Sequence, residues 1–215
     1  LDVLGEGPQA FIQTYRRLFG NPWQYDIGPI VPAGATQPEL SLPWAKSEVW
    51  LFTGGPHSAW GNGTPWGALD FTPQTVQGCT ELSEWVTAMA DGVITRSRWG
   101  EVVQSLDPSG DERIGWSLLY LHIGADDRVS VGAKLKRGDR IGHPSCEGGV
   151  STGAHVHLVR RYNGEWLNAV GDIPFNVGGW SVTEGDAEYD GTLSRDRLTR
   201  EACECKEVGV NGIAW

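Results

Sequence analysis

Histidine and aspartate residues at four places in the chain could together bind a metal ion and move protons. His155 and His157 lie in the segment GAHVHL, and residues two apart in a strand point to the same face. His122 ends the apolar segment SLLYLHI. Asp70 interrupts the apolar segment ALDF, where a carboxylate costs free energy unless it is paired or bound to a cation. His57 precedes Asp70 by thirteen residues, with a glycine-rich loop between them. Each residue alone is more often structural, but the combination predicts a metal site with histidines to spare.

The ligand types favour zinc. Zn²⁺ takes nitrogen and carboxylate ligands at about 2.0–2.2 Å in a tetrahedral arrangement, and catalytic sites use three protein ligands and one water. Zinc lowers the pKa of that water from about 15.7 to near 7. The chain has no HExxH segment, so the glutamate base of the common zinc proteases is missing. A histidine, with an unperturbed pKa of about 6.5, is suited to replace it.

A histidine and an aspartate followed by a His-x-His segment resemble the lysostaphin/staphylolysin-type zinc endopeptidases that cut peptidoglycan. The segments GGPH, LDF, YLHI and STGAHVHL all match, and the thirteen-residue spacing is similar to the staphylolysin-like branch. The resemblance implies that His57, Asp70 and His157 hold one Zn²⁺ per chain. It also implies that His122 and His155 are the catalytic residues.

Two further features of the site follow as expectations. His155 is expected to act as the general base, and His122 to stabilise the oxyanion or to pass a proton to the leaving amine. The sequence does not divide these roles, because both imidazoles are expected to border the same metal. Trp60 and Trp66, in the glycine-rich loop, are expected to line a groove for flat or glycine-rich peptides. Packing within the loop or the core would explain the same tryptophans.

The four cysteines, Cys79, Cys146, Cys203 and Cys205, allow three pairings, and their spacing fits no common zinc ribbon. A Cys-x-Cys pair is awkward to close on itself, and buried free thiols are an alternative to any disulfide. The resemblance implies a Cys79–Cys146 bridge, because the staphylolysin-like branch has a disulfide-bonded cysteine nine residues before the His-x-His segment. Abundant Pro, Gly and Trp with sparse Lys favour an oxidising, extracytoplasmic setting.

The elements that must position these residues are short strands. Residues 46–178 contain apolar and aromatic segments interrupted by Gly or Asp-Gly. They predict a mainly β zinc endopeptidase core, a compact antiparallel β-sandwich or open barrel. Residues 1–45 are expected to form a short helix, with Phe11 and Tyr15 on one face, and an extended segment packed on the core. Residues 179–215 are polar and acidic and are expected to form an irregular C-terminal tail.

The composition, with 40% hydrophobic and 20% charged residues, is that of an ordinary globular protein. The net charge of −10 argues against nucleic acid or an anionic membrane surface as partner, because both call for a basic patch. No apolar run approaches the roughly 18 residues that a membrane span needs. Since the chain begins at Leu1 without Met, we expect a trimmed product of a longer precursor.

Two functions of different classes fit these observations. The first is a secreted, monomeric bacterial zinc endopeptidase that hydrolyses peptidoglycan peptides, such as glycine-rich cross-bridges or stem peptides that contain D-Ala. The second is a non-catalytic peptidoglycan-binding or regulatory module that keeps the fold. Degenerate relatives usually lack a ligand or a catalytic histidine. This chain has the full set, which favours the enzyme.

Overall fold

A computed structural model describes residues 9–21, 24, 28–80 and 82–215 of the chain. Its helices and strands are, in chain order, α1 (Gln9–Phe19), β1 (Trp50–Ser58), β2 (Trp66–Pro73), β3 (Val86–Thr87), β4 (Gly92–Arg98), β5 (Glu101–Ser105), β6 (Trp116–Leu121), β7 (Lys134–Leu135), β8 (Arg140–Gly142), β9 (Val156–Tyr162), β10 (Glu165–Trp166), β11 (Asn176–Val177), β12 (Trp180–Glu184), β13 (Gly191–Arg195), β14 (Leu198–Glu201), α2 (Val208–Asn211) and β15 (Gly212–Ile213). The chain divides into two compact units, Leu1–Ala33 and Gly34–Trp215.

The first unit contains the predicted N-terminal helix, which the structure confirms as α1. Phe11, Tyr15 and Phe19 follow one another at helical spacing, with ring centroids 6.2 Å and 5.1 Å apart, and all three are exposed. Gly20 ends the helix in the left-handed conformation, at φ +81°, and donates its N–H to the carbonyl of Arg16. Residues 1–8 of the expected N-terminal segment lie outside the described residues.

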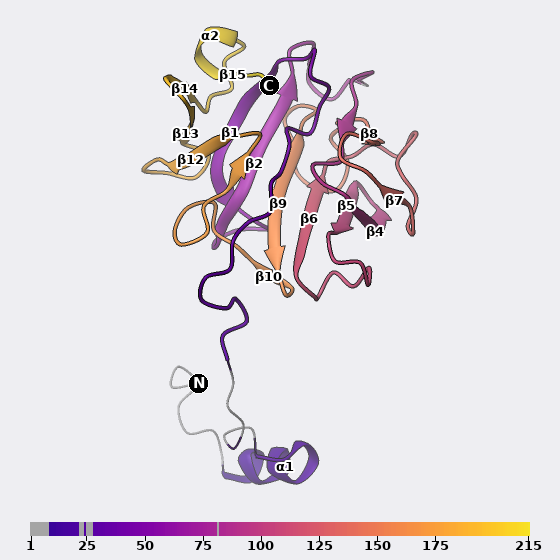
Figure 1. Cartoon of the computed structure of the whole chain (residues 1–215), viewed down its shortest axis with the longest axis vertical. Coiled ribbons are helices and arrows are strands. Elements are labelled where there is room, and N and C mark those ends of the chain that lie inside the picture. Colours follow the sequence, from indigo (N-terminus) through magenta and orange to yellow (C-terminus); the bar gives the residue numbers. More distant parts are fainter. Residues whose placement is uncertain (1–8, 22–23, 25–27, 81) are drawn as a thin grey trace. The chain divides into compact units, whose positions relative to one another are not determined.

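A nine-stranded antiparallel sheet forms the frame of the second unit (Figure 1). Its order is β15-β1-β2-β9-β6-β5-β4-β7, and β10 pairs with β9 as a hairpin. The path ends at β15 and β7, so the strands that the structure describes form an open sheet and no closed barrel. Strand β9 lies between β2 and β6. It therefore pairs with one strand about 90 residues earlier in the chain, β2, and with one about 40 residues earlier, β6.

A smaller, four-stranded sheet, β11-β12-β13-β14, packs beside β1 (Figure 1). Trp180 and Leu193 of this sheet belong to the same hydrophobic cluster as Phe52 and Phe71 of the large sheet. The two sheets therefore share one core, and the expected mainly β, antiparallel sandwich-like architecture is confirmed.

The expectation of an irregular C-terminal tail is wrong. Residues 179–215 contain β12, β13, β14, α2 and β15, and β15 pairs with β1 at the edge of the large sheet. In β12, Trp180 and Val182 are buried while Ser181 and Thr183 are exposed. This alternation is the strand period, and the acidic residues around it hide the pattern in the overall composition of the segment.

The segment before β1 also contributes to the core. Leu40, Leu42 and Trp44 are at most 2% exposed. Trp44 stacks on Trp50 of β1, with ring centroids 5.0 Å apart and planes 6° from parallel. Alternate residues of an extended segment thus cover the sheet that carries the predicted site.

Two disulfides cross-link the second unit. One joins Cys79 to Cys146, 67 residues apart, and the other joins Cys203 to Cys205. The second bridge corrects the expectation that this pair resists closure, because the two Cα atoms are 5.1 Å apart, within the usual range. Buried Asn211 holds the turn by donating from Nδ2 to the carbonyl oxygens of Cys203 (3.0 Å) and Cys205 (2.8 Å). None of the four cysteines is free.

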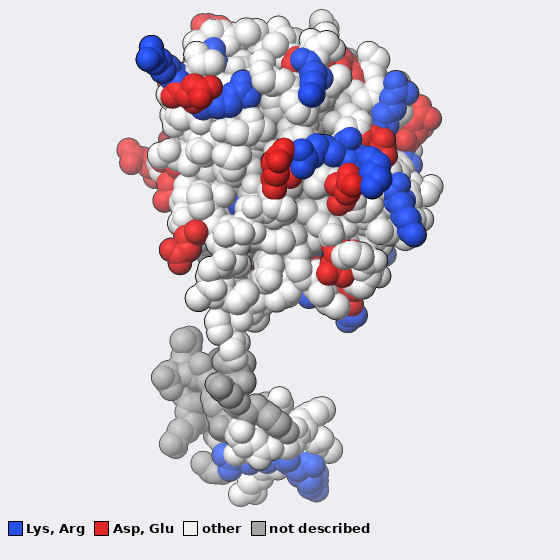
Figure 2. All heavy atoms as spheres, viewed as in Figure 1, with Lys and Arg blue, Asp and Glu red and all other residues white. Residues whose placement is uncertain are grey.

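Charged residues of both signs are interspersed on the face of the larger unit that Figure 2 shows. Lys136 pairs with Asp91 at 2.8 Å and Arg137 with Glu39 at 2.6 Å. Such exposed pairs contribute little to stability. Within the described ranges, neither helix has the length and apolar character that crossing a membrane requires.

Candidate metal centre

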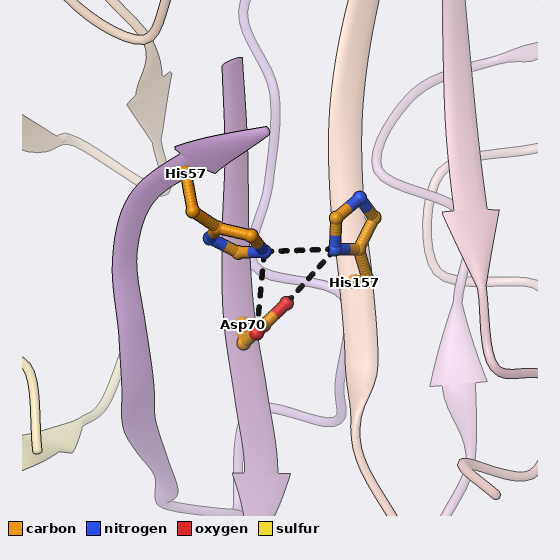
Figure 3. Close-up of side chains that lie close together, drawn as sticks. All are labelled: His57, Asp70 and His157. Carbon is orange, nitrogen blue, oxygen red and sulfur yellow. Dashed lines mark hydrogen bonds and ion pairs between the residues drawn. The ribbon is translucent and has the colours of Figure 1, made fainter. Parts of the chain in front are cut away.

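Strands β1, β2 and β9 bring the three predicted metal ligands together. Asp70 of β2 lies directly opposite His157 of β9. His57, near the end of β1, lies opposite Ala68, two residues before Asp70 on β2. Residues directly opposite in antiparallel strands share a face, as do residues two apart. The sheet register therefore directs all three side chains to one face, where Figure 3 shows them pointing at one another.

The ligand atoms of these three side chains are close together. His57 Nε2 lies 3.0 Å from His157 Nδ1 and 3.4 Å from Asp70 Oδ2, and His157 Nδ1 lies 3.2 Å from Asp70 Oδ1 (Figure 3). All three residues are buried. Asp70 Oδ1 accepts no hydrogen bond within the described part of the chain. A buried carboxylate oxygen of this kind needs a cation or a donor.

Hydrogen bonds to the backbone determine which nitrogen of each ligand imidazole carries its proton. His57 donates from Nδ1 to the carbonyl of Gly55 (2.8 Å), and His157 donates from Nε2 to the carbonyl of Ala59 (3.4 Å). A carbonyl oxygen can only accept, so the opposite nitrogens, His57 Nε2 and His157 Nδ1, carry lone pairs. Two lone pairs and a carboxylate thus converge with no proton between them, and the three residues could hold a metal ion.

Two glycines of the GGPH segment make room for this arrangement. A Cβ at Gly54 would lie 2.8 Å from Asp70 Oδ2, and a Cβ at Gly55 would lie 2.3 Å from the carbonyl oxygen of Asp190. Gly54 therefore allows the Asp70 carboxylate to approach the backbone of β1. Gly55 allows the turn before β13, at Asp190, to approach the same strand.

The other two predicted histidines border the same place. His155 immediately precedes β9, and its Nε2 lies 3.7 Å from Asp70 Oδ1. His122 follows β6, and its ring centroid is 4.4 Å from that of His155. His155 donates from Nδ1 to the carbonyl of Gly153 (2.8 Å), and His122 donates from Nδ1 to that of Glu147 (2.7 Å). In the neutral form, both histidines therefore keep a lone pair on Nε2.

The surroundings favour neutral imidazoles at His57 and His122 and a charged carboxylate at Asp70. Burial lowers the pKa of His122 to about 4, and the nearby charge of His155 acts in the same direction. Burial also lowers the pKa of His57, although Asp70 opposes the shift. Burial alone would raise the pKa of Asp70, but interaction with the neighbouring rings of His155 and His57 outweighs it and holds that pKa well below its usual range. These are the protonation states that metal binding requires.

A cavity of about 920 Å³ opens onto the five residues. Its walls include Trp60, which is 52% exposed, and the glycine-rich segment 148–153. The plane of Trp60 is 7° from that of Trp166, with ring centroids 6.3 Å apart. Trp66, the other tryptophan expected in the groove, is half-buried on β2 and is not among the described residues that line the cavity.

Tyr189 is a residue of this site that the sequence did not indicate. Its ring stacks on His57, with centroids 4.1 Å apart and planes at 21°. Its carbonyl accepts the N–H of Gly55 (2.7 Å), and its N–H donates to the carbonyl of Pro56 (3.2 Å). Tyr189 lies in an acidic segment about 130 residues after His57, and no spacing rule connects the two.

Comparisons with known proteins agree with the site. Residues 76–169 match the family profile described as "Peptidase family M23". This range contains His122, His155 and His157. Protease LasA of Pseudomonas aeruginosa is 29% identical over 202 residues, which are 86% of this chain and 46% of LasA. Beta-lytic metalloendopeptidase of Achromobacter lyticus is 29% identical over 171 residues, which are 75% of this chain and 42% of that protein. The chain thus spans a little under half the length of these two curated relatives.

A solved structure is also similar in fold. It is described as a novel M23 metalloprotease, pseudoalterin, from the deep sea, and it is 25% identical with a TM-score of 0.61. The match covers 79% of this chain and 96% of that one. Fold, site and sequence matches therefore agree: residues 76–169 match peptidase family M23, and the chain is similar in fold to an M23 metalloprotease.

Proposed function

We propose that this chain is a zinc-dependent endopeptidase that hydrolyses peptide bonds in bacterial peptidoglycan. The observation that carries the proposal is the convergence of two imidazole lone pairs and one carboxylate, 3.0–3.4 Å apart, at the wall of a cavity that two further histidines border. Residues 46–178 would form the peptidase core, and residues 1–45 and 179–215 would flank it.

The distances between the ligand atoms support zinc as the metal. Bonds of about 2.0–2.2 Å at tetrahedral angles place ligand atoms about 3.3–3.6 Å apart. The three distances found, 3.0, 3.2 and 3.4 Å, are close to this range without any movement of the backbone. The residues that would hold zinc are His57, Asp70 and His157. Three protein ligands rather than four fit a catalytic site better than a structural one.

Zinc at this position supplies Lewis acidity, which lowers the pKa of water and polarises a carbonyl group. The protein supplies the proton acceptors. His155 Nε2 carries a lone pair beside Asp70, so it can take a proton from the attacking water as general base. His122 Nε2 also carries a lone pair in the neutral form, so it can donate to an oxyanion or a leaving amine only after it has gained a proton.

The lining of the cavity supports substrates with small residues. Gly148, Gly149 and Gly153 present backbone rather than side chains to the cavity, and Trp60 offers a flat apolar face on another part of the wall. Glycine-rich cross-bridges and D-Ala-containing stem peptides have the small side chains that fit such a surface. Trp60 is the residue we propose for contact with the peptide.

The two disulfides support an extracytoplasmic location, since disulfides form and persist in oxidising compartments. We infer that the protein works as a secreted bacterial enzyme. All five predicted site residues come from one chain, so the proposed site needs no second subunit. We therefore propose a monomer.

The test combines metal analysis with release of new amino groups from intact peptidoglycan. About one zinc per chain, and release that stops with a chelator and returns with added zinc, are expected. His155→Ala should keep the zinc and lose hydrolysis. His143→Ala is the matched control, because His143 packs on Trp85 and is absent from the described lining of the cavity. Zinc binding and wall binding without release from several wall types would instead favour a binding module.

A further inference from the structure

The hydrogen bond that orients His122 differs from those of His57 and His155, and like that of His157 it reaches a distant segment. For His57 and His155, the accepting carbonyl lies two residues away in the same segment. For His122, the accepting carbonyl is that of Glu147, 25 residues further along the chain. The protonated nitrogen of His122 therefore depends on the position of a separate loop. Without that carbonyl, both neutral forms of the imidazole would be populated.

The loop itself has little to hold it after Glu147. Gly148 and Gly149 follow, and Val150 is fully exposed. Gly148 has a φ of +87°, and a Cβ there would lie 2.6 Å from the carbonyl oxygen of Trp99. Glycine is needed at this contact, but it also leaves the main chain with more conformational freedom.

Before Glu147, the segment is tied to His122 by Ser145, whose N–H and Oγ–H donate to the carbonyl of His122 (2.7 and 3.1 Å) and whose Oγ accepts the N–H of Glu147 (3.0 Å). An anchor on the far side of this peptide would fix the Glu147 carbonyl further.

The side chain of Glu147 provides such an anchor. Its Oε1 accepts the N–H of Ala125 (2.7 Å), and its Oε2 lies 3.3 Å from Arg128 NH1. The same Arg128 nitrogen donates to the carbonyl of Ile123 (2.9 Å). Ile123 and Ala125 are the first and third residues after His122. The carboxylate therefore ties the loop to the backbone that carries this histidine.

We propose that the Arg128–Glu147 pair is a positioning device for His122. By holding the Glu147 carbonyl against His122 Nδ1, the pair keeps the Nε2 lone pair available at the cavity. The proposal rests on the proposed function only for the effect on turnover, because the protonated nitrogen of His122 can be observed without catalysis.

A role in overall stability predicts different behaviour. The Glu147 side chain is 43% exposed, and exposed ion pairs contribute little to the free energy of unfolding. Removal of the carboxylate should therefore leave the unfolding temperature nearly unchanged and alter His122 locally. The competing anchors are the adjacent Cys79–Cys146 disulfide and the hydrogen bonds of Ser145 to His122, and if they hold the loop without the carboxylate, Glu147→Ala has no effect.

The experiment uses nitrogen NMR of the imidazoles in the zinc-loaded full chain. The kcat and KM are measured with a peptidoglycan-derived peptide, and the unfolding temperature of each protein is measured separately. The wild type should show His122 protonated at Nδ1 and unprotonated at Nε2. Glu147→Ala should move both nitrogen signals toward an average of the two neutral forms and lower kcat about tenfold, with KM and unfolding temperature unchanged. Glu147→Gln should restore the wild-type signals only in part, because its Oε1 can still accept from Ala125 but the ion pair with Arg128 is lost.

The matched control is Glu39→Ala, which removes another exposed carboxylate paired with an arginine, Arg137 at 2.6 Å. It should change neither the His122 signals nor kcat. Wild-type His122 signals in Glu147→Ala would overturn the proposal, and so would a fall in unfolding temperature that accounts for the lost activity. If Glu147→Ala does not fold, unchanged His122 signals in Arg128→Ala, which removes the other partner of the pair, would overturn it equally. A wild-type protein without peptidase activity would refute the proposed function, and the NMR signals would still decide the role of Glu147.

Discussion

Replacement of Gly54 by alanine would test whether the metal centre depends on the close approach of β1 to Asp70. A Cβ at this position would lie 2.8 Å from Asp70 Oδ2, 3.1 Å from its Cβ and 3.2 Å from its Cγ. Gly54 does not have a positive φ, so its backbone conformation is open to alanine. The substitution therefore acts on the carboxylate rather than on the turn.

The size of the effect follows from that distance. Ordinary contacts of a Cβ begin near 3.4 Å. The carboxylate must therefore move by about 0.6 Å, several times the roughly 0.2 Å tolerance of a metal–ligand bond. We expect zinc affinity to fall about 10- to 100-fold, or about 1.4–2.8 kcal/mol. The metal-free protein should lose about 1–3 kcal/mol, which is typical of overpacking.

Competition with a chelator would measure the zinc dissociation constant, and thermal unfolding without zinc would measure the cost to the fold. The matched control is Gly209→Ala on α2, where a Cβ would meet nothing within 4 Å. It should change neither quantity. A folded Gly54→Ala protein that binds zinc as tightly as the wild type would refute the assignment of Asp70 as a ligand held against β1.

Three further predictions follow from the same geometry. Loss of the Cys79–Cys146 disulfide, which spans 67 residues, should lower the free energy of unfolding in urea by about 4 kcal/mol; a loss under about 1 kcal/mol would contradict this. Metal-free protein should lose stability as the pH falls from about 6.5 to about 4. Over that range His122 stays neutral when folded and binds a proton when unfolded, so His122→Gln should show a shallower slope in pH-dependent unfolding. Trp60→Ala should raise KM about 2- to 10-fold, whereas Trp99→Ala, exposed and outside the described cavity lining, should not; equal effects would exclude a specific groove contact.

Local sequence rules predicted much of the candidate metal centre because its polar side chains lie in segments that are otherwise apolar. Asp70 lies in the buried strand β2, where a carboxylate without a partner is costly, and this contrast is visible in the sequence. The two-residue period likewise predicted that His155 and His157 share a face. In the structure, His155 Nε2 lies 3.7 Å and His157 Nδ1 lies 3.2 Å from Asp70 Oδ1. The pairing of β2 with β9, which makes these contacts possible, was not predicted, and only the resemblance to a known family implied that Asp70 and His157 meet.

The C-terminal segment was predicted poorly for a different physical reason. Its strands bury few side chains, such as Trp180, Val182 and Leu193, so its average composition remains polar and acidic. Tyr189 reaches His57 through a backbone with a φ of +72°, an unusual conformation for a tyrosine. Propensity rules disfavour such a residue, and the contact spans about 130 residues, so neither local pattern nor spacing could indicate it.

The main chain carries much of the orientation of this site. Each of the four histidines donates to a backbone carbonyl, so the lone pairs that meet in the cavity are set by where the strands and loops place those carbonyls. Most neighbouring side chains can therefore change without altering the arrangement. The positions that matter most are Gly54, where any side chain would displace Asp70, and Glu147, whose own carboxylate ties its loop to the backbone that follows His122. On this reasoning, the Glu147 carboxylate holds the carbonyl that orients His122, whereas the segment that follows β1 places the Ala59 carbonyl for His157.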